Sequence, residues 1–438
     1  MKNEIVKPSI LPGFMELLPT DQIQFNKLAY NIKKTYESFG FMPIDTPVIE
    51  KSEILLAKGG GETEKQIYRF SKGSNDLSLR FDLTVPLARY VAQNFNSLTF
   101  PFRRYQIGKV YRGERNQKGR FREFYQCDID IVGSNCLSIL NDAEIPSIIY
   151  SIFNNLGFKD FTIKINNRKL LNGFFESLEI EDKSDVLRII DKIDKIGVTL
   201  VTEELLSSGI SNDAVEQILK FINITGNNQE ILFLLENLNI STESFKEGLC
   251  ELSEVTKYVK LFGVPDDNIK IDLKISRGLD YYTGTVYETF LNEYPSIGSV
   301  CSGGRYDNLA EYYTKQKLPG VGISIGLTRL FYQLNEVGFF KKDISTCITK
   351  VLVIPLDNNI DYGISFAKTL RDKGIITEIY LEDTKIVKKL GYANKLGIPF
   401  VILIGDSEVQ NKNVSLKNMI TGEQITVDFD TAYKIVNV

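Results

Sequence analysis

From Thr20 onward, apolar residues recur every three or four positions until Gly40. This spacing predicts an amphipathic helix that ends at the glycine. The next ten residues, 41–50, are FMPIDTPVIE and contain two prolines. Because proline cannot donate a hydrogen bond to a neighbouring strand, we expect this segment to form an edge strand or an interface rather than a helix.

Residues 76–84, DLSLRFDLT, alternate strictly between apolar and polar side chains. An alternation of period two predicts a strand with one buried face and one polar face. Arg80, Asp82 and Thr84 fall on the polar face. This face is therefore a candidate for binding or catalysis.

Two more predicted strands flank a basic loop. Arg112 and Glu114 share a face of the first, KVYRGE, at residues 109–114. The second, FYQCDIDIVG, covers residues 124–133 and carries a polar face made of Gln126, Asp128 and Asp130. A hairpin joined by residues 115–121 would bring the arginine and the carboxylates together on one antiparallel sheet.

The middle of the chain changes to helical periodicity. Apolar stripes at helical spacing occur within residues 184–197, with Ser184 as the expected cap and Gly197 as the stop, and again within residues 245–259. Strand patterns resume at IKIDLKISRG, residues 269–278, and continue to a predicted helix that holds Arg329. We therefore expect a helical module inserted into a sheet-based domain.

The last part of the chain alternates strands with helices that end at Gly374 and Gly397, which predicts a separate α/β domain with a mainly parallel sheet. The predicted organisation has four segments: the first part of the sheet-based domain at 1–165, the inserted helices at 166–262, the second part of the sheet-based domain at 263–340, and the α/β domain at 347–438.

Composition places the chain among soluble globular proteins, with 43% hydrophobic and 25% charged residues. No run of 18 apolar residues occurs, and the N-terminus lacks the apolar region of a signal peptide. The five cysteines show no C-x-x-C pair, as in proteins of a reducing compartment. We expect a cytoplasmic protein with no membrane partner.

The sequence contains no histidine. This excludes the Ser-His-Asp triad, the Cys-His pair and the usual zinc hydrolase site, because each requires an imidazole. Any chemistry must use carboxylates, cations, hydroxyls and the groups of the substrates themselves. The sequence identifies no metal ligands.

Residues 103–122 hold eight basic residues and one acid, Glu114. Such a cluster fits a phosphate site, with a solvated basic loop as the alternative. Arginine suits phosphate because its planar fork donates two parallel hydrogen bonds and keeps its charge. Together with the acids on the predicted strands and with Arg277, Tyr281, Tyr282 and Arg329, the cluster indicates a pocket for an amino acid beside a nucleotide.

Several motifs resemble those of a known family. YRGERNQKGRFREFYQCDIDIVG, at 111–133, is similar to motif 2 of class II aminoacyl-tRNA synthetases. RGLDYYTGTVYE at 277–288 and GGRYD at 303–307 resemble the two signatures of histidine–tRNA ligases, and FDLTVPLARY at 81–90 matches one branch of them. Residues 40–50 and 322–330 resemble motifs 1 and 3. The resemblance covers nearly the whole chain.

The resemblance implies an α+β fold. It consists of an antiparallel-sheet class II synthetase catalytic domain with an inserted helical module, followed by a C-terminal α/β anticodon-binding domain. The implied reaction is the ATP-dependent ligation of L-histidine to its tRNA, tRNA(His), through a histidyl-adenylate, with Mg²⁺ accompanying ATP. The resemblance also implies a homodimer formed through motif 1, with Pro47 near the interface.

Residue roles also follow from the resemblance. It assigns Arg112 to the α-phosphate of ATP, Glu114 to the adenine side, and Arg120 and Arg329 to the outer phosphates. Arg277 matches the catalytic arginine, which acts together with Arg112. Asp82, Thr84 and Gln126 match the residues that hold the α-amino group, whereas Asp130, Tyr282 and Tyr306 match those around the imidazole ring. Tyr281 is expected to be part of the wall.

Two other functions are alternatives to histidine–tRNA ligation. A regulatory paralogue of these synthetases is the non-catalytic partner of the ATP phosphoribosyltransferase in histidine biosynthesis, and it typically lacks the C-terminal domain that is present here. A class II ligase for another amino acid disagrees with RGLDYY and GGRYD. Four lysines of the last domain, Lys385, Lys388, Lys389 and Lys395, either contact the tRNA anticodon arm or form a solvated helix face.

Overall fold

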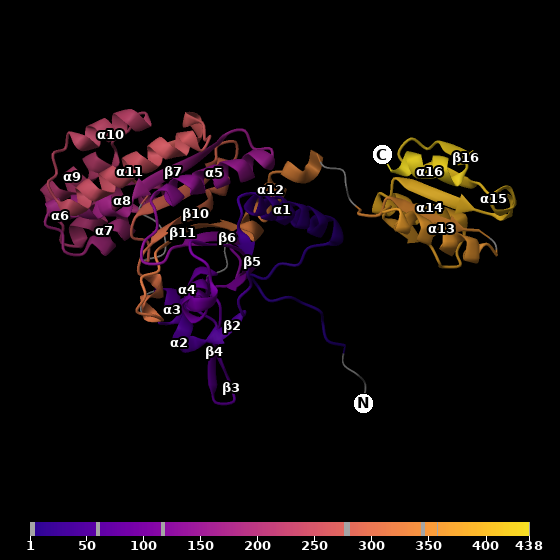
Figure 1. The fold of residues 1–438 in the computed structure, drawn as a ribbon, viewed down its shortest axis with the longest axis horizontal. Coiled ribbons are helices and arrows are strands. Elements are labelled where there is room, and N and C mark those ends of the chain that lie inside the picture. Colours follow the sequence, from indigo (N-terminus) through magenta and orange to yellow (C-terminus); the bar gives the residue numbers. More distant parts are fainter. Residues whose placement is uncertain are drawn as a thin grey trace. The chain divides into compact units, whose positions relative to one another are not determined.

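The computed structural model describes residues 5–57, 62–114, 119–275, 281–342, 347–356 and 358–437. They fall into two compact units. One consists of the residues up to Met15 together with Leu28–Val337, and the other of Glu16–Lys27 together with Gly338–Val438. Figure 1 shows the elements of each unit.

The first unit is built on an eight-stranded sheet with the strand order β1-β5-β6-β11-β10-β9-β7-β8. Among the described strands, the edge strand β1 pairs in parallel with β5, and the edge strand β8 pairs in parallel with β7. All other neighbouring strands pair antiparallel. In sheet order the strands are β1 Met42–Pro43, β5 Phe102–Tyr111, β6 Glu123–Val132, β11 Gly320–Gly326, β10 Ser299–Tyr306, β9 Thr285–Leu291, β7 Phe161–Asn167 and β8 Ile269–Ile271.

The predicted hairpin is confirmed, because β5 and β6 pair antiparallel along ten residues. The first strand ends at Tyr111, so Arg112 and Glu114 lie just beyond it. The strands β6, β10 and β11 are also adjacent. One face of β6 points into the core with Cys127, Ile129 and Ile131, none of which has measurable exposure.

Helices cover this apolar face. Helix α5, Leu140–Asn155, packs on β7, β10 and β11. Tyr36, near the end of α1 (Pro19–Ser38), is fully buried and donates a 2.9 Å hydrogen bond to the carbonyl oxygen of Cys127. The opposite face of β6 carries the polar residues that sequence alternation predicted.

The strand predicted at residues 76–84 is wrong beyond Leu79. Strand β4, Asn75–Leu79, belongs to a small sheet with β2 (Ile49–Lys51) and β3 (Arg69–Lys72), and helix α4 begins at Thr84 and ends at Gln93. Asp82 Oδ1 accepts hydrogen bonds from the backbone N–H groups of Thr84 (3.2 Å) and Val85 (2.9 Å). The carboxylate thus stabilises a helix start, which ends the strand.

Six helices connect β7 to β8, and Figure 1 shows them gathered together beside the main sheet. They are α6 Arg168–Ser177, α7 Lys183–Ile190, α8 Ile193–Ser207, α9 Asn212–Ile222, α10 Asn228–Glu236 and α11 Glu243–Leu261. The helix expected to run from Ser184 to Gly197 instead ends at Ile190. Its cap is Asp182, whose side chain accepts from the backbone N–H of Asp185 at 2.9 Å.

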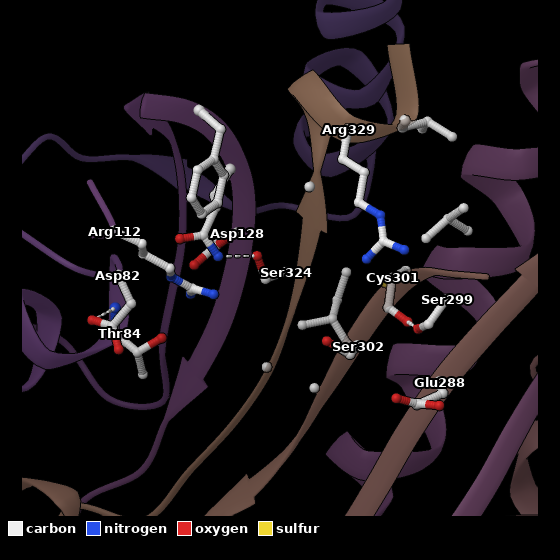
Figure 2. Close-up of a pocket in the computed structure, with 18 of the residues that line it drawn as sticks. Asp82, Thr84, Arg112, Asp128, Glu288, Ser299, Cys301, Ser302, Ser324 and Arg329 are labelled. Atoms are coloured by element: carbon white, nitrogen blue, oxygen red, sulfur yellow. Dashed lines mark hydrogen bonds between the residues drawn. The ribbon is translucent and has the colours of Figure 1, made fainter. Parts of the chain in front are cut away.

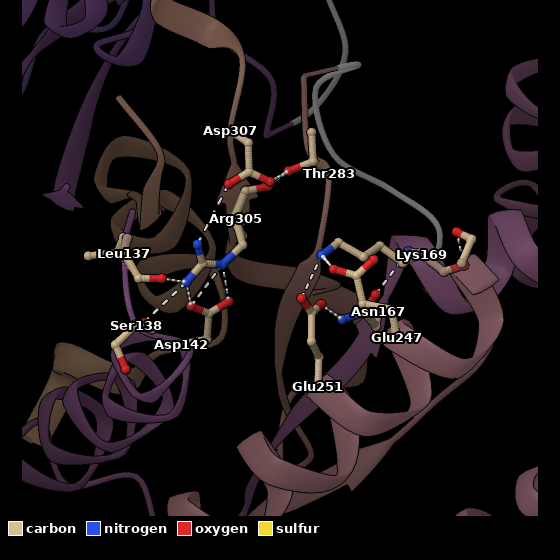
Figure 3. Close-up of polar contacts among 11 residues, drawn as sticks. Leu137, Ser138, Asp142, Asn167, Lys169, Glu247, Glu251, Thr283, Arg305 and Asp307 are labelled. Carbon is tan, nitrogen blue, oxygen red and sulfur yellow. Dashed lines mark hydrogen bonds and ion pairs between the residues drawn. The ribbon is translucent and has the colours of Figure 1, made fainter. Parts of the chain in front are cut away.

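Helices α6 and α11 cross in close backbone contact. A Cβ atom on Gly173 would lie 2.1 Å from the backbone nitrogen of Phe245, and one on Gly248 would lie 2.2 Å from that of Leu170. Glycine is therefore required at both positions. The crossing is also held by Lys169, whose Nζ lies 2.5 Å from Glu247 and 2.6 Å from Glu251 (Figure 3).

The second unit contains a five-stranded sheet with the order β13-β12-β14-β15-β16. Its parallel part consists of β12 (Val351–Pro355), β13 (Thr377–Ile379) and β14 (Phe400–Ile404), whereas β15 (Val414–Asn418) and β16 (Gln424–Val427) pair antiparallel. The sheet is thus mixed rather than mainly parallel. The α-helices of its C-terminal part are α13 Ile360–Asp372, α14 Ile386–Leu396, α15 Asp406–Asn411 and α16 Phe429–Val436. Within the described residues, no helix is long and apolar enough to cross a membrane.

Candidate active site

A cavity of about 650 Å³ lies over the polar face of β6, β10 and β11. Every predicted site residue within the described part of the chain lines it: Asp82, Thr84, Arg112, Glu114, Arg120, Gln126, Asp130, Tyr282, Tyr306 and Arg329. Tyr281, expected to be part of the wall, also lines it. Arg277 lies outside the described residues. Residues separated by as many as 247 positions in the sequence therefore share one cavity.

Two glycines of the neighbouring strand β11 make room for the polar side chains. A Cβ atom on Gly322 would lie 2.3 Å from Asp130 Oδ1, and one on Gly320 would lie 2.5 Å from the ring of Tyr306. Both glycines belong to β11, which runs beside β6 and β10. A larger residue at either position would displace a side chain of the cavity.

Asp130 has two strong partners at the base of the cavity. The hydroxyl of Tyr306 donates to Asp130 Oδ1 at 2.8 Å, and Arg104 Nη2 lies 2.5 Å from Asp130 Oδ2. Burial raises the pKa of Asp130 to about 6, although Arg104 and Tyr306 both act to lower it. The buried carboxylate is thus held in a fixed position by two donors.

The prediction that the basic residues of 103–122 form a phosphate site is too broad, as Arg104 shows. Several of these cations have acidic partners: Arg103–Glu144, Arg104–Asp130, Lys109–Glu123 and Arg120–Glu114. Arg104 has no exposed surface and cannot reach a phosphate in solution. Arg112 and Arg120 do line the cavity. Alternate residues of β5 point to opposite faces, so the segment as a whole is not one phosphate site.

Arg112 lies beside Asp82 and Thr84 (Figure 2). Its guanidinium is 4.3 Å from the ring centroid of Phe81 and 5.1 Å from that of Phe124, and its Nε donates to the carbonyl oxygen of Phe81 at 3.2 Å. Burial lowers the pKa of Arg112, with Asp82 opposing the shift, but an arginine keeps its charge in proteins. The aromatic rings fix the direction of this cation.

Another part of the cavity is formed around Arg329. This residue comes from α12 (Leu327–Glu336), and its Nη2 donates to the carbonyl oxygen of Ile297 at 3.0 Å. Figure 2 shows its guanidinium above Cys301 and Ser302, with Glu288 below them. The cavity therefore presents a cation at each of two separate positions.

Three tyrosines form a further part of the wall. The ring centroids of Tyr281 and Tyr282 are 4.9 Å apart, and those of Tyr281 and Tyr306 are 5.9 Å apart, all in edge-to-face arrangements. Burial raises the pKa of each hydroxyl above its ordinary value, so all three remain protonated at neutral pH. They offer hydrogen-bond donors and acceptors in an otherwise aromatic wall.

Two family models match the chain. Residues 13–330 match the family model described as histidyl-tRNA synthetase. The chain belongs to the histidyl-tRNA synthetase family. Residues 350–437 also match the anticodon binding domain model.

Relatives of this histidyl-tRNA synthetase family member match it along its length. The chain is 64% identical over 436 residues to the histidine–tRNA ligase of Clostridium tetani, covering 100% of this chain and 99% of the relative. It is 51% identical to that of Clostridium acetobutylicum, covering 96% and 98%. The crystal structure of histidyl-tRNA synthetase from Nostoc sp. PCC 7120 matches with a TM-score of 0.90 at 41% identity, covering 99% and 100%. These matches confirm the predicted family and fold class.

Sequence reasoning assigned no role to several residues that line the cavity of this histidyl-tRNA synthetase family member. They are Asp128, Glu288, Ser299, Cys301, Ser302 and Ser324. Asp128 carried a usable signal, because it shares the face of Gln126 and Asp130 by simple alternation. Glu288 of β9 is the last residue of the quoted motif RGLDYYTGTVYE, whereas Ser299, Cys301 and Ser302 of β10 carried no signal because the motif there is GGRYD.

Proposed function

We propose that this chain ligates L-histidine to tRNA(His) with ATP, through a histidyl-adenylate. The observation that carries the proposal is the single cavity in which buried carboxylates and tyrosines stand beside two separately positioned arginines, Arg112 and Arg329. Anionic and aromatic groups suit an amino acid with an imidazole ring, whereas the arginines suit a polyphosphate.

The amino acid is proposed to bind on β6 and β10. A neutral imidazole has one N–H donor and one acceptor nitrogen, so a carboxylate and tyrosine hydroxyls satisfy both. Asp130, Tyr282 and Tyr306 are proposed to recognise the ring, and Asp82, Thr84 and Gln126 the α-amino group. A ring that leaves these buried groups unpaired is rejected, by roughly 10⁴-fold in sites of this kind.

The nucleotide is proposed to bind through arginine. Arg112 is assigned to the α-phosphate, Glu114 to the adenine side, and Arg120 and Arg329 to the outer phosphates. Glu114 and Arg120 form an ion pair of 3.2 Å, and both line the cavity. Mg²⁺ is proposed to arrive with ATP, since it usually binds through one or two carboxylates plus phosphate oxygens, and Glu288 is a carboxylate of the cavity wall.

Neither chemical step needs a histidine of the enzyme. In the first, a carboxylate oxygen of the substrate attacks the α-phosphorus of ATP and pyrophosphate leaves. In the second, a terminal ribose hydroxyl of the tRNA attacks the carbonyl carbon of the adenylate and AMP leaves. Arg277, by resemblance, and Arg112 stabilise the negative charge that develops at the α-phosphate, and fixed cations do this without any proton transfer.

We further propose the domain organisation of the chain and its partners. Residues 1–165 and 263–340 form the catalytic domain, 166–262 the inserted helical domain and 347–438 the anticodon-binding domain. The active form is a cytoplasmic homodimer joined through motif 1. Lys385, just before α14, and Lys388 and Lys395 on it are exposed and suit the tRNA backbone. Lys389 is partly covered and donates to the carbonyl oxygen of Pro355 at 3.4 Å.

The deciding experiment is amino-acid-dependent exchange of labelled pyrophosphate into ATP, measured with each of the twenty amino acids. Exchange with histidine alone is the expected result. Exchange with a different amino acid would overturn the assignment. Absence of exchange together with binding to an ATP phosphoribosyltransferase would favour the regulatory paralogue, which the matched C-terminal domain and the cavity arginines disfavour.

A further inference from the structure

Two acceptor atoms on β6 lie buried in the cavity wall. Gln126 Oε1 and Asp128 Oδ1 are out of contact with solvent and have no hydrogen-bond partner among the described residues. The two side chains are 7% and 2% exposed and both line the cavity. Buried polar atoms in native proteins are nearly always paired, so two unpaired acceptors on one strand face need an explanation.

The amide nitrogen of Gln126 is already occupied. Gln126 Nε2 donates to Ser324 Oγ at 2.6 Å, which fixes the amide and leaves its oxygen as the free end. Ser324 is also the cross-strand neighbour of Asp128 in the β6–β11 pair. At Gln126 Oε1 and Asp128 Oδ1 themselves, the capacity that remains is that of an acceptor. A ligand group that fits here must donate hydrogen bonds, and an anion does not fit.

The charges around Asp128 also favour a positively charged ligand group. Asp128 has Asp82 and Asp130 as neighbouring carboxylates, and burial together with these charges raises its pKa to about 7, with Arg104 and Ser324 acting in the opposite direction. Arg104 makes its close ion pair with Asp130. A buried carboxylate without a paired cation is costly, and a bound cation would offset that cost.

One oxygen of Asp82 is already engaged. Its Oδ1 already accepts two backbone N–H groups at the start of α4. Asp130 is engaged by Tyr306 at one oxygen and by Arg104 at the other. Of the neighbouring carboxylates Asp82, Asp128 and Asp130, Asp128 is the one with a buried oxygen that has no hydrogen-bond partner among the described residues.

We propose that Asp128 is a substrate-binding residue that accepts a hydrogen bond from the α-ammonium group of the amino acid, with Gln126 Oε1 accepting a second. This inference rests on the proposed function. An ammonium group carries three donors and a positive charge, and so satisfies both acceptors and neutralises the carboxylate. Asp128 then selects for substrates that carry the ammonium group.

The test compares two ligands on two proteins. L-histidine and imidazole-4-propionate, which has hydrogen in place of the ammonium group, are titrated into the full chain and into Asp128→Asn by calorimetry. The wild type is expected to prefer histidine. In Asp128→Asn, histidine affinity falls about 10- to 100-fold, the range for a hydrogen bond to a charged group, while imidazole-4-propionate affinity stays within about threefold. The preference for histidine therefore largely disappears.

The controls separate this inference from the proposed function. Asp194→Asn, which removes an exposed carboxylate on α8, should bind both ligands like the wild type. Equal losses for both ligands in Asp128→Asn, or an unchanged preference, would overturn the role of Asp128 while leaving the proposed function standing. A wild type that binds no histidine would instead overturn the proposed function. If the amide variant does not fold, Asp128→Ser gives the same comparison with a smaller uncharged side chain.

Discussion

Arg305 Nη2 lies 2.6 Å from Asp142 Oδ2, and both side chains are almost completely buried (Figure 3). The same guanidinium nitrogen donates to the carbonyl oxygens of Leu137 and Ser138, each at 3.2 Å. Arg305 precedes Tyr306 on β10, and Asp142 lies in the first turn of α5. One cation thus ties the start of a helix to the strand that carries a cavity tyrosine.

Replacing Arg305 with methionine should destabilise the chain strongly. The change leaves the Asp142 carboxylate buried without its cation, which typically costs about 3–5 kcal/mol. Thermal unfolding of the full chain measures the loss. Asp142→Asn combined with Arg305→Met should recover part of it, because the unpaired charge is removed. Arg188→Met, which breaks a solvent-exposed pair with Asp185, is the control and should change stability by less than about 1 kcal/mol.

Tyr306→Phe should weaken histidine binding. The hydroxyl donates to Asp130 at 2.8 Å, and a hydrogen bond to a charged group contributes about 1.5–3 kcal/mol, so the expected loss is about 10- to 100-fold in affinity. Calorimetry with L-histidine measures it. Tyr105→Phe removes a comparable 2.7 Å hydrogen bond to Glu37 outside the cavity and should bind histidine normally. Equal affinities of the two variants would contradict the assignment.

The stability of the chain without histidine should fall as pH rises from about 4 to about 7. The pKa of Asp130 is raised to about 6 and that of Asp128 to about 7, mainly by burial. The folded chain therefore keeps protons that the unfolded chain has already lost, and the associated stability is lost progressively as pH rises from about 4, the ordinary pKa of Asp, to about 7. For Asp128, a shift of about three pKa units corresponds to roughly 4 kcal/mol as an upper figure.

This pH effect is measured by comparing melting temperatures of the wild type and Asp128→Asn from about pH 5 to about pH 8. The variant has no charge to bury, so its advantage over the wild type should grow with pH. Saturating L-histidine should remove much of that advantage at the upper end, because a cation then pairs with Asp128. A difference between the two proteins that does not change with pH would contradict the prediction.

Arg329→Lys should raise the KM for ATP in pyrophosphate exchange by about tenfold or more, because an ammonium group cannot form the two parallel hydrogen bonds of a guanidinium with phosphate. Histidine binding measured without ATP should be unchanged. Arg103→Lys is a matched control, since Arg103 pairs with Glu144 and does not line the cavity. An unchanged KM for ATP would remove Arg329 from the nucleotide site.

Arg277→Ala should reduce exchange by about 10²- to 10³-fold, the range for loss of one group that stabilises developing charge. The melting temperature should stay close to that of the wild type. Retained exchange would remove Arg277 from the mechanism. A large fall in melting temperature would instead assign it a structural role.

The amino-acid sequence by itself determined the faces of the strands, the course of the central hairpin and the family. Alternation placed Gln126 and Asp130 on one face of β6, and the motifs identified the remaining predicted site residues, all of which line one cavity wherever the structure describes them. These features are local, because side-chain direction along a strand follows from backbone geometry alone.

Tertiary structure decided how the charged groups are paired. Arg104 belonged to a segment that looked like a phosphate site, yet it is buried against Asp130. Asp82 looked like a strand residue, yet it caps a helix. Asp128 shared a face with its neighbours, yet its Oδ1 is buried without a hydrogen-bond partner among the residues that the structure describes. The partner of a buried charge depends on which strands and helices lie beside it. The sequence pattern of one strand does not determine that arrangement.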